Sequence, residues 1–183
     1  ELHAARGRVL AHDIVAGHDL PPFANSAMDG FAVRAADLVD GAATRLRIAG
    51  TRYAGDGETA SIGIGECVRI TTGAPLPEGA DTVVIKERVL IEGDVLVVPA
   101  GETRGANVRR AGEDCARGER ALAAGEAIGA AALGVLASLG QAQVEVVRRP
   151  RVAVLTTGDE LVMPGERLGH AQIHNSNGYT LAA

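Results

Sequence analysis

Up to residue 98 the chain shows short apolar runs separated by turn residues, which is the pattern of a β-rich protein. The clearest runs occupy residues 46–49, 67–71 and 82–89. Residues 89–98 hold two further runs around Gly93 and Asp94, and this arrangement predicts a hairpin. A shorter run at residues 8–15 alternates imperfectly and predicts one more strand. We therefore expect residues 31–98 to form mainly β-structure.

The pattern changes to a helical period after residue 127. Apolar side chains recur at the spacing that places them on one helix face, at Ile128, Ala131, Ala132, Val135, Leu136 and Leu139. Gly140 follows at the position where glycine commonly ends a helix. The sequence thus predicts a helix over 128–139, followed by a strand over 143–147.

A third pattern begins after the Arg-Arg-Pro boundary at residues 148–150. Residues 151–158 form a continuous apolar run that ends in small polar residues, as the first strand of a buried parallel sheet does. Too few residues follow to complete such a domain. Residues 178–183 have the character of a helix that is cut short, and the chain does not begin with Met. We expect the chain to be a piece of a longer protein.

Composition narrows the class of protein. Of the 183 residues, 46% are hydrophobic and only 2% aromatic, so the core is built from Ala, Val, Leu and Ile. The net charge of −5 excludes the basic surface of a nucleic-acid-binding protein, and any anion site has to be local. Cys67 and Cys115 lack metal-ligand spacing and fit a reducing cytoplasm, and no apolar run reaches membrane-spanning length. No nucleic-acid or membrane partner is expected.

Two segments in the β-rich region carry candidate chemistry. Residues 18–30 form a long loop with two Pro, in which Asp29 is either an exposed functional carboxylate or part of an ordinary Asp-Gly turn. Residues 69–77 place Thr71 and Thr72 at the end of a strand. These hydroxyls either hold an oxyanion or belong to a strand-end turn.

Two further segments follow. In residues 109–114 two Arg pair either with phosphates or with the neighbouring carboxylates, including Asp114. Residues 157–161 place Asp159 and Glu160 at the predicted carboxyl end of a strand, where they either bind a metal or ligand or cap a helix. The sequence has no P-loop, no paired C-x-x-C and no zinc-protease pattern.

Taken together and in order, these segments resemble the molybdopterin molybdenumtransferase family, which includes bacterial MoeA and the E domain of gephyrin. Residues 25–33 (NSAMDGFAV) resemble the family pattern N-S-A-M-D-G-[YF]-A-V. Residues 69–77 (RITTGAPLP) resemble R-I-x-T-G-A-P-x-P, and residues 108–114 (VRRAGED) resemble I-R-x-x-G-E-D. Residues 157–161 match T-G-D-E-L. The four patterns cover essentially the whole chain.

The resemblance implies a multidomain α+β fold. Residues 1–18 and 107–147 would form an elongated, discontinuous first domain. Residues 19–106 would form a β-rich domain inserted into it. Residues 148–183 would be the truncated start of an α/β molybdopterin-binding domain.

The resemblance also implies an enzyme of molybdenum cofactor biosynthesis. Its substrates would be molybdate and adenylated molybdopterin, its by-product AMP, and its assisting cation magnesium (Mg2+). The family implies a cytoplasmic homodimer, with molybdopterin adenylyltransferase as upstream partner and a site between the third domain of one subunit and the second domain of the other. The alternative within the same family is a non-catalytic scaffold or assembly module.

The family patterns assign roles to individual residues. Catalytic positions would be Asp29, Thr72 and Glu160, with Asp29 also a metal ligand. Cofactor binding would fall to Thr157, Gly158, Asp159, Glu160 and Asp114. Asp114 has the alternative role of supporting structure between domains. The family's downstream glycine-rich and lysine-containing segments are absent, so we expect the chain alone to be inactive.

Overall fold

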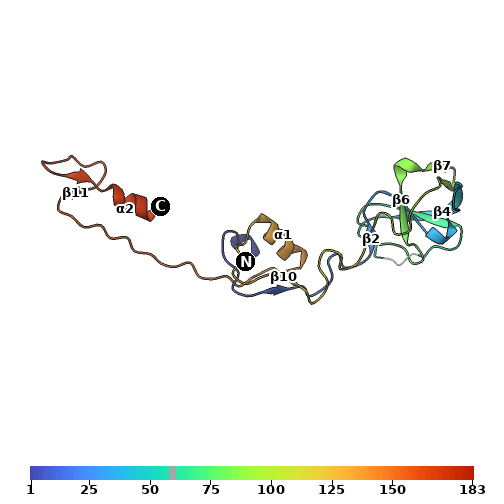
Figure 1. Ribbon diagram of the computed structural model, residues 1–183, viewed down its shortest axis with the longest axis horizontal. Helices are drawn as coiled ribbons and strands as arrows, with labels where there is room; N and C mark the ends of the chain where they lie inside the picture. The colour runs from blue at the N-terminus through green and yellow to red at the C-terminus, as the bar shows by residue number, and fades with distance from the viewer. Residues whose placement is uncertain (58–60) are drawn as a thin grey trace. The chain divides into compact units, whose positions relative to one another are not determined.

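The computed structural model describes residues 1–57 and 61–183, and the chain divides into two compact units, residues 1–146 and 147–183. The first unit confirms the α+β class, because it combines a curled, mixed six-stranded sheet with few helices (Figure 1). In spatial order the strands are β6 (Thr82–Ile85), β3 (Gly30–Val33), β5 (Glu66–Ile70), β4 (Thr44–Arg52), β8 (Val95–Val98) and β7 (Leu90–Glu92).

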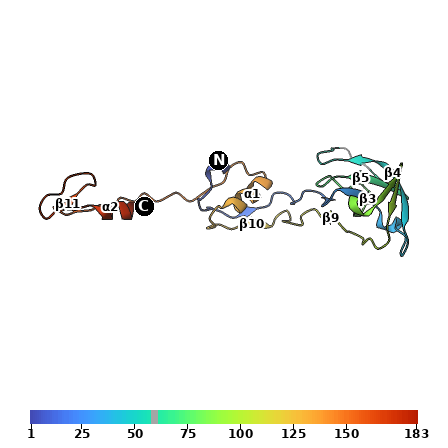
Figure 2. The ribbon, with the colours of Figure 1, turned by 90° about the horizontal axis from the view of Figure 1, so that it is seen from above.

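The centre of the sheet is organised around β3. This strand runs antiparallel to both neighbours, and Gly30 lies opposite Ile70 on β5 and Ile85 on β6. Figure 2 shows β3, β4 and β5 side by side. Within the six-stranded sheet β4 and β5 form a parallel pair, and the predicted hairpin at Gly93 is confirmed, since β7 and β8 pair antiparallel around it.

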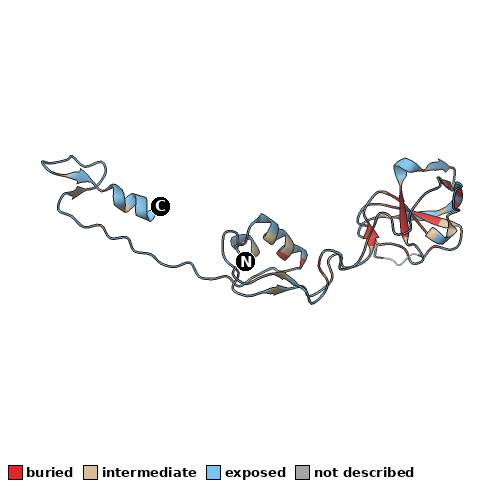
Figure 3. Cartoon of the chain, in the orientation of Figure 1, coloured by how far each residue is buried: buried red, intermediate tan, exposed pale blue. Residues whose placement is uncertain are grey.

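Both faces of β3 are buried, which explains its continuous apolar sequence. Phe31 and Val33 point into one cluster, and Ala32 points into another, as the two-residue period of a strand requires. The first cluster also contains Leu46, Cys67, Val84, Leu96 and Val98. Figure 3 shows these buried positions gathered in the sheet.

Gly30 on β3 packs directly against the backbone of β6. A Cβ atom at this position would overlap the backbone carbonyl of Val84 on β6, so the strand pair leaves room only for glycine. Gly50 on β4 differs, because a Cβ there would meet no atom within 4 Å. The sheet therefore contains one glycine required by packing and one that packing does not require.

One predicted strand is shorter than its apolar pattern. The run at 82–89 ends as a strand at Ile85, and Lys86–Arg88 form a 3-10 helix, η3. These three residues are charged and have no strand partner, so the chain turns here. A second 3-10 helix, η2 (Ala35–Asp37), follows β3.

The segments that lead into and out of the sheet pair with each other. β1 (Ile14–Val15) pairs with β10 (Arg120–Leu122), and β2 (Asn25–Ser26) pairs with β9 (Val108–Arg109), both antiparallel. Between these pairs the Leu20 N–H donates to the Cys115 carbonyl at 2.8 Å. The strand predicted at 8–15 is confirmed only in part, since Val9 and Leu10 form isolated bridges.

The predicted helix is confirmed as α1 (Ala130–Ser138). It ends where expected, because Gly140 adopts a left-handed φ of 71°. Leu136 packs with Ala5, Leu10 and Ile128, near a 3-10 helix, η1 (Leu2–Ala4). The strand predicted at 143–147 is wrong, because this segment makes only one isolated bridge among the described residues, from Val146 to Leu10. Its neighbour near Leu10 and Ala11 is too short to form a continuous ladder with it.

The second unit is small. It contains a parallel two-stranded ladder, β11 (Leu161–Val162) with β12 (Ile173–His174), and helix α2 (Ser176–Ala182), which confirms the helical character of the last residues. The strand predicted at 151–158 is wrong, because these residues form no strand and most are exposed. A buried parallel strand needs a neighbour on each side, and the described residues of this unit supply none for this run. Within residues 1–57 and 61–183, no helix has the length and apolar character needed to cross a bilayer.

Candidate functional site

The antiparallel arrangement of the central strands brings three polar side chains together. Asp29 precedes β3, Thr72 follows β5 and Lys86 follows β6. Since β3 runs opposite to both neighbours, its beginning lies beside their ends. Residues separated by 43 and 57 positions in the chain are therefore in contact.

Both carboxylate oxygens of Asp29 have partners. The Thr72 backbone N–H and hydroxyl each donate to Oδ1 at 2.9 Å. The Lys86 ammonium lies 3.2 Å from Oδ2, and the Lys86 backbone N–H donates to the Asp29 carbonyl at 3.1 Å. The Thr72 N–H, then the Thr72 hydroxyl and Lys86, lower the pKa of Asp29 from 3.8 to about 2. Asp29 is thus a fixed, ionised carboxylate.

A pocket of about 410 Å³ opens beside this contact. Asp29 and Lys86 line one part of it, and Tyr53, Arg69 and Ile91 line another. The Arg69 guanidinium lies over the Phe31 ring, 5.4 Å from its centroid, a cation–π geometry that holds the guanidinium in place. The pocket thus combines fixed charges with aromatic and apolar walls, as small-molecule sites commonly do.

The lowered pKa of Asp29 predicts a pH dependence of stability. An ionised Asp29 stabilises the fold above the unfolded-state pKa, and this contribution is lost as the pH falls from 3.8 towards about 2. Asp29→Asn is expected to lower the thermal midpoint at pH 6, and the difference from wild type should shrink below pH 4. Thermal unfolding followed by circular dichroism between pH 2 and 6 measures this difference in thermal midpoint. The exposed Asp40→Asn is the control, and a constant difference across this range would contradict the prediction.

The surroundings of Asp29 do not fit a magnesium ion. Mg2+ requires an octahedron of oxygen ligands. Asp29 offers one carboxylate, already hydrogen-bonded at both oxygens, with a lysine ammonium 3.2 Å away that competes for it. In the part of the chain that the structure describes, no group of three or more His, Cys, Asp or Glu side chains is arranged to hold a metal. No step is therefore assigned to a metal at Asp29.

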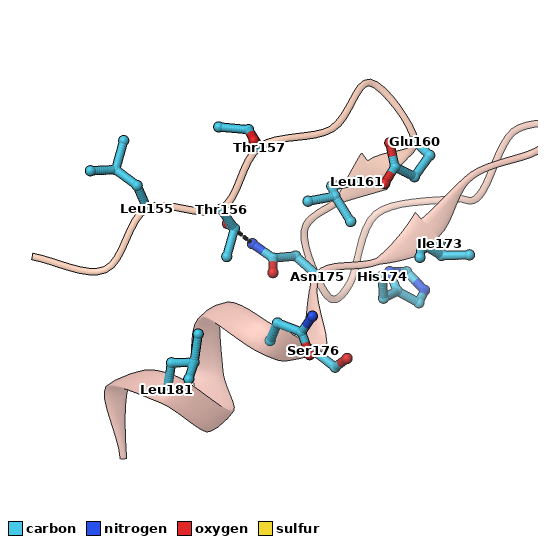
Figure 4. Close-up of a pocket in the computed structure, with 11 residues that line it drawn as sticks. Leu155, Thr156, Thr157, Glu160, Leu161, Ile173, His174, Asn175, Ser176 and Leu181 are labelled. Carbon is cyan, nitrogen blue, oxygen red and sulfur yellow. Dashed lines mark hydrogen bonds between the residues drawn. The ribbon is translucent and has the colours of Figure 1, made fainter.

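The second unit has its own pocket, of about 320 Å³ (Figure 4). Thr157 and Glu160 line it, together with Thr156, His174 and Asn175. Asn175 Nδ2 donates to the Thr156 hydroxyl at 2.7 Å, and Asn175 Oδ1 accepts from the Gly178 N–H at 3.0 Å. Asn175 therefore holds the Thr156 segment against the start of α2. The Glu160 side chain is exposed.

Two of the predicted cofactor-binding residues do not line this pocket. Gly158 lies against the Glu160 side chain, and a Cβ atom at this position would overlap the Glu160 carboxylate. Its lack of a side chain therefore leaves space for Glu160, and Gly158 itself does not line the pocket. Asp159 is exposed and is absent from the lining. The alternative of helix capping by Asp159 is wrong, because residues 159–160 form a turn that leads into β11.

Asp114 lies in a different environment. Arg109 Nη2 donates to both oxygens of Asp114 at 2.6 Å, and the pair raises the pKa of Arg109. The Asp114 backbone N–H donates to the Leu20 carbonyl at 2.8 Å. The Arg109–Asp114 bonds hold the segment leaving the sheet in its own fold, and the bond to Leu20 joins that segment to the one entering the sheet, which fits the structural alternative for Asp114.

The structure thus brings together two sets of predicted residues. Asp29 and Thr72 touch in the first unit, and Thr157 and Glu160 share a pocket in the second. Sequence reasoning did not single out Lys86, although it is the only lysine of the chain. Its proximity to Asp29 follows from strand pairing, which no local pattern shows.

Neither cysteine adds chemistry to these sites. Cys67 and Cys115 are both buried and unpaired. Burial, with a smaller contribution from the Glu66 charge, raises the pKa of the Cys67 thiol to about 12. Cys67 is therefore a protonated core residue rather than a nucleophile.

The chain has relatives whose similarity extends along nearly all of it. It is 41% identical over 186 residues to molybdopterin molybdenumtransferase 2 of Mycobacterium tuberculosis, covering 100% of this chain and 46% of that protein. It is 39% identical over 181 residues to molybdopterin molybdenumtransferase of Haemophilus influenzae, covering 98% and 44%. The chain thus spans less than half the length of these relatives.

The fold has solved counterparts as well. A crystal structure of a molybdopterin biosynthesis MoeA protein from Pyrococcus horikoshii matches with a TM-score of 0.90 and 33% identity, covering 98% of this chain and 49% of that one. The sequence model described as the MoeA N-terminal region (domain I and II) matches residues 1–140. The chain belongs to the MoeA family.

Proposed function

We propose that the complete protein to which this chain belongs inserts molybdate into adenylated molybdopterin and releases AMP. The observation that carries this proposal is the contact between Asp29 and Thr72, which joins residues from two separate family patterns beside a pocket that Asp29 lines. The contact stabilises the fold, and it also holds an exposed, ionised carboxylate at a fixed position beside the pocket. The names of the relatives support the same reaction.

In this proposal Asp29 is an ionised, immobile carboxylate that orients a substrate group or a water molecule at the pocket. Thr72 and Lys86 fix its position, so little reorganisation is needed during the reaction. Glu160 and Thr157 orient the pterin by hydrogen bonds from the second unit. The complete enzyme would act as a homodimer in which the two sets of residues come from different subunits.

The domain division implied by the family is part of the proposal. Strands β3 to β8 all lie between residues 30 and 98, which supports an inserted domain at 19–106. The packing of Leu10 with Ile128 and Leu136 supports a discontinuous domain formed by 1–18 and 107–147. Residues 148–183 would form the start of the molybdopterin-binding domain.

The test is molybdenum insertion in vitro from molybdate and adenylated molybdopterin. The complete polypeptide is expected to form the cofactor and release AMP, whereas residues 1–183 alone are expected to do neither. A folded but inert complete protein would overturn the proposal and favour the scaffold alternative. Activation by an upstream partner is tested by supplying the substrate bound to molybdopterin adenylyltransferase.

A further inference from the structure

The charges around the pocket beside Asp29 are unequal. Its lining contains two basic side chains, Lys86 and Arg69, and one carboxylate, Asp29. The chain as a whole carries a net charge of −5. A local excess of positive charge favours the binding of anions.

Both oxygens of the single carboxylate already have partners within the protein. Lys86 lies 3.2 Å from Asp29 Oδ2, and Thr72 occupies Oδ1 with two hydrogen bonds. The Lys86 ammonium has three N–H donors and uses one of them here, so two remain for a ligand. Its side chain is 57% exposed, which leaves these donors accessible from the pocket.

Arg69 supplies the second cation. Among the described residues it makes no ion pair, and its guanidinium is held over the Phe31 ring instead of beside a carboxylate. A guanidinium that stacks on a ring keeps its N–H edge free for an oxyanion. The Thr71 hydroxyl lines the same pocket and accepts the Ala54 N–H at 3.3 Å, so its own proton is available to donate.

From this arrangement we infer that the pocket bounded by Asp29, Tyr53, Arg69 and Lys86 binds a tetrahedral oxyanion, with Lys86 and Arg69 as its ligands. Lys86 takes the position beside Asp29 that a divalent cation would need. The inference rests on the proposed function, which offers two oxyanions: molybdate itself and the phosphate of an adenylate. Tyr53 and Ile91 give the same pocket a wall on which a flat ring can pack.

The test uses molybdate alone and AMP alone as probes, with adenosine as the uncharged control. Because Lys86 is the only lysine, labelling the lysine side chain with 15N gives one ammonium signal that reports on this pocket. At least one of the two oxyanions is expected to shift the Lys86 ammonium signal in the 183-residue chain. Adenosine is expected to leave this signal unchanged. Binding of AMP without molybdate assigns the pocket to an adenylate phosphate, and the reverse assigns it to molybdate.

Variants separate the pocket from general charge effects, with calorimetric titration as the readout. Lys86→Met and Arg69→Gln are each expected to weaken the bound oxyanion about tenfold or more, and Lys86→Arg is expected to retain most of the affinity. The matched control is Arg45→Gln. Arg45 is also a cation of the sheet, but it is paired with Glu92 and does not line the pocket. Unchanged affinity in the Lys86→Met and Arg69→Gln variants overturns the inference, as does an equal loss in the control. Failure of both oxyanions to bind overturns it too.

Turnover of the complete protein is measured separately, so that the two proposals fail in different ways. Molybdenum insertion without Lys86-dependent oxyanion binding overturns the inference and leaves the proposed function standing. Lys86-dependent binding in a complete protein that inserts no molybdenum keeps the binding site and overturns the function.

Discussion

Replacing Gly30 by alanine is expected to lower the free energy of unfolding of the sheet by roughly 3 kcal/mol or more. The added Cβ would overlap the Val84 carbonyl, which is backbone and cannot rotate away. Either β3 and β6 separate, which costs their hydrogen bonds, or the strands shift and disturb the packing of Phe31. Denaturant unfolding of the wild-type and variant chains measures the difference.

Gly50→Ala is the matched control, because Gly50 is also a strand glycine but has open space around its Cα. This change is expected to alter stability by less than about 1 kcal/mol. Equal destabilisation by both substitutions would mean that a cost common to strand glycines, rather than contact with the Val84 carbonyl, explains the result at Gly30, because reduced flexibility of the unfolded chain acts in the opposite direction and stabilises the fold.

Removing the Glu160 side chain is expected to lower turnover of the complete enzyme about 100-fold, the usual effect of losing one positioned hydrogen-bonding group. In the structure the carboxylate borders the pocket of the second unit and is exposed, so its removal should hardly change the thermal midpoint. Glu160→Ala is assayed for molybdenum insertion, and thermal unfolding is measured on the same sample.

Glu166→Ala is the control for this experiment, since Glu166 is exposed in the same unit but does not line the pocket. It is expected to retain wild-type turnover. A large loss of thermal stability in Glu160→Ala, with turnover reduced only in proportion to the unfolded fraction, would contradict a role in the reaction and assign Glu160 to structure.

Local patterns predicted the elements whose stability is mainly local. The hairpin was recognisable because Gly93, with a φ of 67°, sits between two apolar runs that need no distant partner. Helix α1 was recognisable from its period and from Gly140. The run at 151–158 is as apolar as a buried strand, but apolar character does not supply a neighbouring strand, and the prediction failed there.

The site shows the same limit. Asp29 and Thr72 were predicted because their segments have the family patterns, whereas no feature of the sequence places Lys86 beside them. The apolar pattern even hid Lys86 inside a predicted strand at 82–89, which in fact ends at Ile85. Contacts across 57 residues depend on strand order, and strand order is a property of the whole sheet.

The pairing of the segments before and after the sheet has a consequence for the order of events during synthesis. Residues 9–26 leave the ribosome before the sheet, whereas their partners at 108–127 and at Val146 leave it only after the whole sheet. The sheet can close once residue 98 has emerged, while Leu10 and Ile14 still lack the residues that bury them. A nascent chain halted when β8 has just emerged from the ribosome should therefore carry a protease-resistant sheet and a cleavable leading segment, which becomes protected only after α1 has emerged as well.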